Sequence, residues 1–120
     1  MLTEEQIFRL MDIANAGCHK GMVTEARTIY DGILSLKPDH VPAMIGQAFS
    51  HMVIEEYAEA EEKLRGILAD HPDDKDASAA LGLCMLLAGR KDDARELLKT
   101  LKNTEGPAAQ LADVLLEQCN

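Results

Sequence analysis

The sequence predicts an all-α fold, in which three helix pairs stack into an α-solenoid and a C-terminal helix caps the stack. Three alanines, Ala26, Ala60 and Ala94, recur in segments with helical periodicity at an equal spacing of about 34 residues, the period of a helix–turn–helix repeat. Pro38 and Pro72 are separated by the same interval and mark the same place in consecutive repeats. A small residue recurs where two helices cross closely, because a larger side chain would hold them apart.

Composition predicts one globular domain over residues 1–120. Apolar residues make up 47% of the chain and charged residues 28%, which is close to the average for globular domains. The chain has no Trp, two Phe and two Tyr, so we expect a core of Leu, Ile, Met and Ala. Long β-branched runs are missing, and we therefore expect no sheet.

The first repeat is expected at about residues 6–38. Thr3 and Gln6 have the spacing of a capping box, in which each side chain bonds to the backbone of the other, so the first helix begins there. Its apolar periodicity lasts until Gly17. A second helix is expected from about residue 24 to 37, where Pro38 stops it.

The second and third repeats are expected at about residues 39–72 and 73–106. Asp39 is the expected cap of the third helix, with Pro42 in its first turn. Asp73 or Asp74 caps the fifth helix, which is apolar almost all round and is therefore expected at the centre of the fold. After Gly106, a shorter helix at about residues 107–118 is expected to cover the apolar end of the stack.

Over about residues 6–104, these features resemble the tetratricopeptide repeat (TPR) family. That family has small residues in the first helix, a turn glycine, an alanine and a large apolar residue in the second helix, and a closing proline. The third repeat matches best, with Leu81-Gly82, Gly89, Ala94 and Leu98. The first two repeats match at Gly21, Ala26, Tyr30 and Pro38 and at Ala48, Ala60, Leu64 and Pro72. Glu55 stands where the family has the turn glycine.

The charge of the chain limits its partners. A formal net charge of −9 argues against nucleic acid, since phosphate binding needs clustered Lys and Arg, and against an anionic membrane surface. Nine acidic residues lie between Glu55 and Asp76. They are either a solvated outer helix face or a patch that steers a basic partner.

We expect a protein of the reducing cytoplasm. The three cysteines, Cys18, Cys84 and Cys119, are odd in number and form no CxxC pair. The N-terminal residues lack the basic and apolar regions of a secretion signal, and no apolar run is long enough to span a bilayer.

We expect no enzyme, no cofactor and no metal site. Four histidines, His19, His40, His51 and His71, do not pair with other ligand-type residues at the spacing of a metal site. Cys18 and His19 come closest, but neighbouring residues on one helix point in different directions. The sequence also contains no evident nucleophile with a base beside it.

The TPR resemblance implies that the first helix of each pair lines a concave groove. The residues placed there are Phe8, Met11 and Asn15, then Ile45, Phe49 and Met52, and then Leu83 and Leu86, with Ala79 and Leu87 beside them. These side chains either belong to the core or lie under the capping helix, chiefly in the third repeat, or they form an apolar strip that binds a helical or extended peptide. The family's clamp for acidic chaperone tails is matched only at Asn15 and is therefore expected to be absent.

The predicted function is thus a non-enzymatic protein-binding module. In size and layout the chain resembles the small TPR chaperones of type III secretion systems, which hold secreted subunits soluble before export. This resemblance implies a cytoplasmic chaperone or adaptor that holds an amphipathic helix of its partner. The alternative is a general TPR scaffold for complex assembly or self-association as a homo-oligomer.

Overall fold

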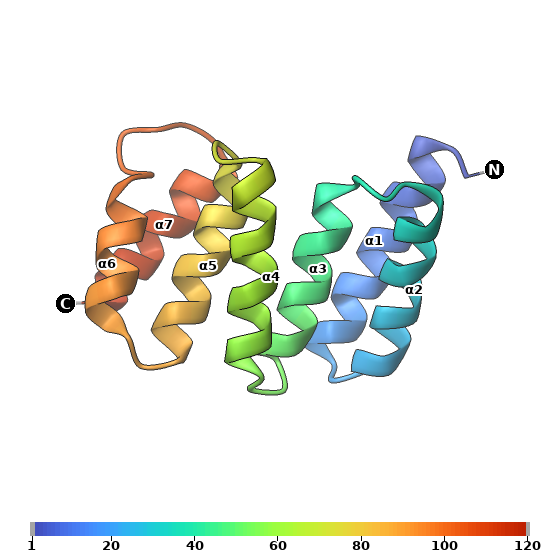
Figure 1. Cartoon of the computed structure of the whole chain (residues 1–120), viewed down its shortest axis with the longest axis horizontal. Coiled ribbons are helices and arrows are strands. Elements are labelled where there is room, and N and C mark those ends of the chain that lie inside the picture. The colour runs from blue at the N-terminus through green and yellow to red at the C-terminus, as the bar shows by residue number, and fades with distance from the viewer. Residues whose placement is uncertain (1, 120) are drawn as a thin grey trace. The chain divides into compact units, whose positions relative to one another are not determined.

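The computed structural model describes residues 2–119, which form seven α-helices and no strand (Figure 1). The helices are α1 (Glu4–His19), α2 (Val23–Leu36), α3 (Val41–Met52), α4 (Tyr57–Asp70), α5 (Lys75–Leu87), α6 (Lys91–Lys99) and α7 (Pro107–Gln118). The all-α prediction is therefore confirmed. None of these helices is long and apolar enough to cross a membrane.

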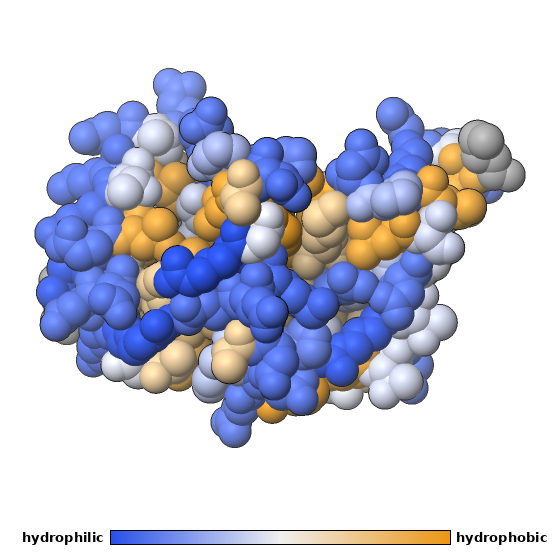
Figure 2. Space-filling view, in the orientation of Figure 1, coloured by the Kyte–Doolittle hydropathy of each residue, from blue (hydrophilic) through white to orange (hydrophobic). Residues whose placement is uncertain are grey.

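The helices belong to two compact units that divide between Glu56 and Tyr57. The first unit contains α1, α2 and α3, and the second contains α4 to α7. Much of the surface seen in Figure 2 is hydrophilic, with apolar side chains in smaller patches between. The expectation of a single domain with repeats at about residues 6–38, 39–72 and 73–106 stays a prediction.

Polar side chains begin three of the helices. Thr3 Oγ1 accepts a hydrogen bond from the Gln6 N–H at 3.1 Å, and Gln6 Oε1 accepts one from the Thr3 N–H at 2.9 Å, so the capping box is confirmed. Asp74, one of the two predicted caps of α5, accepts from the Ala77 N–H at 2.9 Å.

The prediction that Asp39 caps α3 is wrong. The cap is His40, whose Nδ1 accepts from the Ala43 N–H at 3.2 Å. A cap must stand directly before the first helical residue to reach the free N–H groups of the first turn, and α3 begins at Val41, so Asp39 lies one residue too early. His40 and Asp74 are separated by one repeat period, as equivalent caps should be.

The turns between paired helices repeat the same backbone geometry. Gly21, Glu55 and Gly89 follow one another at the repeat period and have positive φ angles of 81°, 63° and 85°. After each one, the next residue donates its N–H to a carbonyl five residues earlier: Met22 to Gly17 at 2.8 Å, Glu56 to His51 at 2.9 Å and Arg90 to Met85 at 2.9 Å. This left-handed helix ending favours glycine. Glu55 therefore adopts the conformation of the glycine that it replaces.

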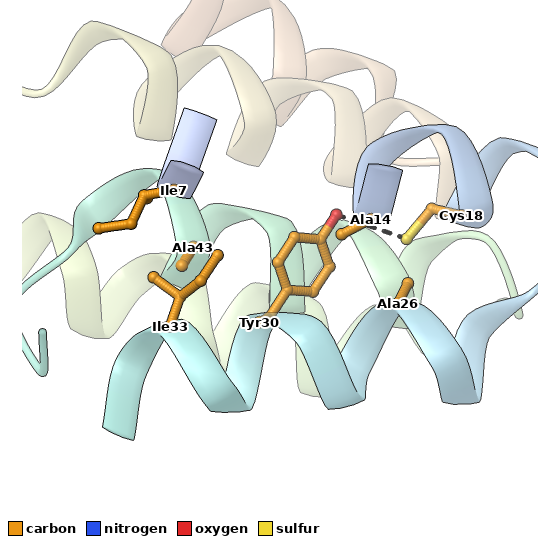
Figure 3. Close-up of a cluster of buried hydrophobic side chains, with 7 residues drawn as sticks. All are labelled: Ile7, Ala14, Cys18, Ala26, Tyr30, Ile33 and Ala43. Atoms are coloured by element: carbon orange, nitrogen blue, oxygen red, sulfur yellow. Dashed lines mark hydrogen bonds between the residues drawn. The ribbon is translucent and has the colours of Figure 1, made fainter. Parts of the chain in front are cut away.

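The core of the first unit lies between α1, α2 and α3, which pack on one another (Figure 3). Its buried side chains include Ile7, Ala14, Cys18, Ala26, Tyr30, Ile33 and Ala43. Gly46 permits a close approach of α3 to α2, because a Cβ added there would lie 2.3 Å from Cε1 of Tyr30. A bulkier residue at that position would separate the two helices.

The core of the second unit surrounds α5, which packs against α4, α6 and α7. The expectation that this apolar helix is central is confirmed within the unit. A Cβ added at Gly82 would lie 2.5 Å from Cδ2 of Leu98, so α5 and α6 also approach closely. The buried residues of α7 are Ala108, Ala109, Ala112 and Leu115.

An ion pair occupies the same repeat positions in both units, with its charges reversed. In the first unit, Arg27 Nη2 lies 3.2 Å from Glu56 Oε1. In the second, Glu61 pairs with Arg90. Glu61 and Arg90 stand one repeat period after Arg27 and Glu56, respectively. The same two repeat positions can therefore hold the ion pair with either order of charges.

Candidate functional site

A cavity of about 420 Å³ opens in the first unit between one face of α1 and the segment that joins α2 to α3. We call it the first-unit groove, and the residues that line it are Glu4, Ile7, Phe8, Met11, Asp12 and Asn15 on α1, with Lys37, His40 and Pro42. Residues three and four apart on a helix share one face, which brings the α1 members together. Three predicted binding residues, Phe8, Met11 and Asn15, thus line one cavity.

The apolar part of the groove is formed by Ile7, Phe8 and Met11. Ile7 is buried in the core, and Met11 is half-buried against it. Phe8, by contrast, leaves 67% of its surface exposed. An aromatic ring that stays in water at a cavity can gain hydrophobic free energy when a partner covers it.

Asn15 forms the polar end of the groove wall and is tied to the core. The Tyr30 hydroxyl donates to Asn15 Oδ1 at 2.5 Å. The same hydroxyl lies 3.7 Å from Cys18 Sγ, a contact that Figure 3 shows. Burial, with a smaller effect of Cys18, raises the pKa of Tyr30 well above its usual range. The Tyr30 hydroxyl therefore stays protonated at physiological pH and remains a hydrogen-bond donor.

Charged groups complete the rim of the groove. Glu4 and Asp12 lie along α1, and Lys37 lies on the opposite wall. None of the ion pairs formed within residues 2–119 includes these three side chains. Their charges are therefore available to a bound molecule, subject to screening by salt.

The other predicted binding residues lie outside this cavity. In α3, Ile45 and Phe49 are half-buried and Met52 is buried. Phe49 packs on the core of the first unit, and its ring meets that of His19 edge-on with centroids 5.3 Å apart. Leu83 and Leu86 are half-buried in α5 of the second unit. Contacts of these five residues with a partner remain predictions.

Six lining residues were not predicted as binding residues, and one of them, Ile7, is a core residue of α1. Glu4 and Asp12 share the face of Phe8 on α1, so helical spacing alone could have found them. Lys37 and His40 belong to the connection between α2 and α3, and Pro42 lies in the first turn of α3. Their place beside α1 depends on how the three helices pack, for which the sequence offers no local signal.

The described residues show few groups suited to catalysis. Residues 2–119 contain no cluster of three His, Cys, Asp or Glu side chains that could hold a metal ion. The three cysteines are free and buried. Cys84 Sγ donates to the Tyr57 carbonyl at 3.4 Å, and burial raises the pKa of this thiol, which makes it a poor nucleophile.

Comparisons with known proteins agree with this fold. A family model described as "Tetratricopeptide repeat" matches residues 55–119, which include α4 to α7 and make up more than half of the chain. No curated protein sequence matches.

Two solved structures are similar. The Yersinia enterocolitica type III secretion translocator chaperone SycD has a TM-score of 0.69 and 13% identity, and the match covers 99% of this chain and 86% of SycD. A "MamA RS-1 ArsTM double mutant" has a TM-score of 0.56 and 23% identity, with 94% of this chain and 57% of that chain covered. At these identities the likeness shows the fold alone.

Proposed function

This chain belongs to the tetratricopeptide repeat family, and we propose that it is a protein-binding module whose first-unit groove holds an amphipathic helix of a partner protein. The observation that carries the proposal is Phe8, a largely exposed aromatic ring at a cavity of about 420 Å³. An amphipathic helix offers apolar side chains at helical spacing, which is the usual way in which a helix fills an apolar groove. Such anchors would cover Phe8 and Met11.

The rim of the groove suits basic groups on that partner. Glu4 and Asp12 are eight residues apart on α1, which places them about 12 Å apart along the helix axis. A helix lying along α1 with Lys or Arg two turns apart would meet both carboxylates. Such complementarity chiefly raises the association rate and the specificity, and it accords with the net charge of −9.

The biological role that we propose is a cytoplasmic, non-enzymatic chaperone or adaptor that shields an apolar helix of its client. Support comes from the likeness to SycD, which spans nearly all of this chain, together with the exposed groove. Ile45 and Phe49 in the first unit, and Leu83 and Leu86 in the second, are half-buried and are proposed as further client contacts, each within its own unit. Met52 is buried and is not proposed as a contact. SycD is only 13% identical to this chain, so we describe the client by the chemistry of the groove alone.

A scaffold that self-associates is the second candidate. The outer side of α7 carries Leu111 and Val114, both exposed. A capping helix usually has a polar outer face, so these two residues favour contact with another protein surface.

The test of the groove is the substitution Phe8→Ala. The probe is a fluorescein-labelled, 18-residue amphipathic peptide of Leu, Lys and Gln, with Leu at helical spacing, titrated by fluorescence anisotropy. Removal of an anchor residue is expected to weaken binding by about 2 kcal/mol, or roughly thirtyfold. Helicity by circular dichroism should not change, because Phe8 is largely exposed.

The matched control is Ile13→Ala, since Ile13 is 60% exposed on the same helix but does not line the groove. Equal losses in the two variants, or no saturable binding by the unsubstituted protein, would contradict the proposal. The chaperone role further requires that equimolar protein reduce the light scattering of this peptide under conditions in which the peptide alone aggregates. Phe8→Ala should reduce the scattering less. A dimer abolished by Val114→Lys, without groove binding, would instead support the scaffold.

A further inference from the structure

We propose that Tyr30 is a positioning residue for the first-unit groove. Its hydroxyl holds the side-chain amide of Asn15 so that the Nδ2 hydrogens face the groove and donate to a carbonyl oxygen of the bound helix. This inference rests on the proposed function, and it adds a polar contact that fixes where the partner helix ends.

One hydrogen bond orients the side-chain amide of Asn15, which is otherwise exposed. Its Oδ1 accepts from the Tyr30 hydroxyl at 2.5 Å, and the Tyr30 ring is fully buried against Gly46. A ring clamped in this way cannot follow Asn15 if the amide rotates. An asparagine amide has one acceptor atom and one donor atom. Because Tyr30 engages the acceptor, the donor atom remains for the groove that Asn15 lines.

Cys18 is compatible with this direction of donation, since either partner of its contact with Tyr30 can be the donor. Its Sγ lies 3.7 Å from the Tyr30 hydroxyl oxygen, and both side chains are fully buried. The hydroxyl has one proton, which it gives to Asn15, so the thiol can donate to the hydroxyl oxygen. The hydrogen bonds then run in one direction, from Cys18 through Tyr30 to Asn15.

The other repeats show that packing does not require these polar groups. The residues one and two repeat periods after Asn15 are Phe49 and Leu83. Those at the same intervals after Tyr30 are Leu64 and Leu98, which are also fully buried.

Cys18 follows the same pattern, since Met52 and Leu86 take its place in the later repeats. The repeat thus packs with apolar residues at all three positions. Burying a hydroxyl costs free energy unless it is hydrogen-bonded. A polar group that the fold does not need, and that reaches Asn15 at a cavity, points to a role in binding.

The donor also indicates which part of a partner helix it meets. Inside an α-helix every carbonyl already accepts an N–H, and only the last four carbonyls are free. We therefore place the C-terminal turn of the bound helix against Asn15. Its apolar anchors then lie over Phe8 and Met11, on the preceding turns of α1.

The experiment is a double-mutant cycle with the 18-residue peptide described above. Tyr30→Phe keeps the ring and removes only the hydroxyl. One hydrogen bond has a modest net effect, so we expect affinity to fall roughly three- to tenfold. In an Asn15→Ala background, Tyr30→Phe should have no further effect, because Tyr30 acts through Asn15. An equal loss in both backgrounds would overturn the positioning role.

A second variant avoids any change in the core. Asn15→Asp keeps the oxygen that Tyr30 engages but lacks the amide donor, so it should bind the peptide as weakly as Asn15→Ala. Wild-type affinity in Asn15→Asp would overturn the inference. In the double-mutant cycle, affinity is compared only at temperatures where each variant is folded. A lower thermal stability of Tyr30→Phe therefore does not affect the comparison.

Nuclear magnetic resonance separates this inference from the proposed function. In the free protein, the two Asn15 Nδ2 hydrogens should have resolved, displaced shifts that move to unstructured values in Tyr30→Phe. Unchanged shifts would overturn the positioning role even if the groove binds peptide. If Phe8→Ala leaves peptide affinity unchanged while the Asn15 shifts respond to Tyr30→Phe, the proposed function fails and the local geometry stands.

Discussion

Each of the two units packs a glycine against a large buried side chain, but between different helices of the repeat: Gly46 lies on the helix after that of Tyr30, and Gly82 on the helix before that of Leu98. In the first unit a glycine of α3 meets the flat ring of Tyr30, and in the second a glycine of α5 meets the branched side chain of Leu98. Tyr30 and Leu98 occupy the same repeat position and are both fully buried. Only Tyr30 carries a hydroxyl, and that hydroxyl reaches the groove wall through Asn15. The repeat thus keeps the same backbone arrangement, while the buried side chain at one position differs in chemistry between repeats.

The polar contacts between repeats support the same conclusion. Arg27 is joined by Ser50, His51 and Glu56, with Arg27 Nε donating to Ser50 Oγ at 2.8 Å. At the equivalent position of the next repeat, Glu61 has Arg65 and Arg90 as partners. The sign of the charge is reversed, and one partner position, that of Glu56 and Arg90, is kept. The side chains therefore decide which residues form polar pairs between helices, while the backbone arrangement stays the same.

The largest expected difference between the units is at the two close approaches. A Cβ in Gly46→Ala would meet ring atoms of Tyr30 at 2.3–2.9 Å, and a buried ring cannot bend away. In Gly82→Ala the contacts are with Cδ2, Cγ and Cδ1 of Leu98, a side chain that can change rotamer as a ring cannot. Overpacking should cost about 2–3 kcal/mol in Gly46→Ala and about 1 kcal/mol in Gly82→Ala, where better helix propensity offsets part of the strain. Urea unfolding followed by circular dichroism measures both.

The double variant Gly46→Ala, Tyr30→Leu is the control for this prediction. It gives the first unit the side chain that the later repeats use, and it should recover part of the lost stability. Equal costs in Gly46→Ala and Gly82→Ala would mean that the nature of the opposing side chain does not matter, and the contrast between the units would fail.

The turns offer a smaller contrast. Glu55 has a φ of 63° where the other two repeats have glycine. A left-handed conformation costs an ordinary residue roughly 1–2 kcal/mol, so Glu55→Gly should stabilise the protein by about 0.5–1 kcal/mol after the entropy of the unfolded glycine is counted. Gly89→Ala should destabilise it by a similar amount. Thermal unfolding of both variants checks the signs, and a destabilised Glu55→Gly would show that the Glu55 side chain is needed there.

The smallest effect concerns pH. His51, with Arg27, lowers the pKa of Glu56 below its ordinary value of 4.5, and Arg65, with Arg90, lowers that of Glu61. A lowered folded-state pKa adds stability that is fully present above pH 4.5 and is lost as the pH falls through the folded value. The melting temperature should therefore fall on acidification.

The fall in melting temperature on acidification should be smaller in Glu56→Gln and in Glu61→Gln. Because these groups are partly exposed, we expect each variant to differ from the parent by no more than a few degrees. Glu62→Gln is the control, since Glu62 is exposed and forms no ion pair within residues 2–119. An acid response in Glu56→Gln and Glu61→Gln identical to that of Glu62→Gln would remove the paired carboxylates as its cause.

Much of the fold could be predicted from the spacing of a few residues. The period between Ala26, Ala60 and Ala94 indicated repeated helix pairs, and all three alanines are buried. The apolar character of the fifth helix indicated that it is central, and it packs on three other helices. The cap of α3 was misplaced at Asp39 because adjacent polar residues give almost the same local signal.

The candidate site could be predicted only in part. Phe8, Met11 and Asn15 lie on one face of α1, and helical periodicity is enough to group them. Lys37 and His40 come from a different segment, and their place in the groove arises from how α1, α2 and α3 pack. Local patterns describe one element at a time, so they do not contain the distance between two elements.

The sequence by itself determined the helical class, the repeat period and the small residues at the helix crossings, because these follow from periodicity and side-chain size along one chain. Only the tertiary structure decided that the Tyr30 hydroxyl meets Asn15 and Cys18, or that Arg27 and Glu61 have partners 29 residues away. Such pairings depend on helix packing at the scale of an ångström, whereas sequence patterns record only which face of a helix turns inward.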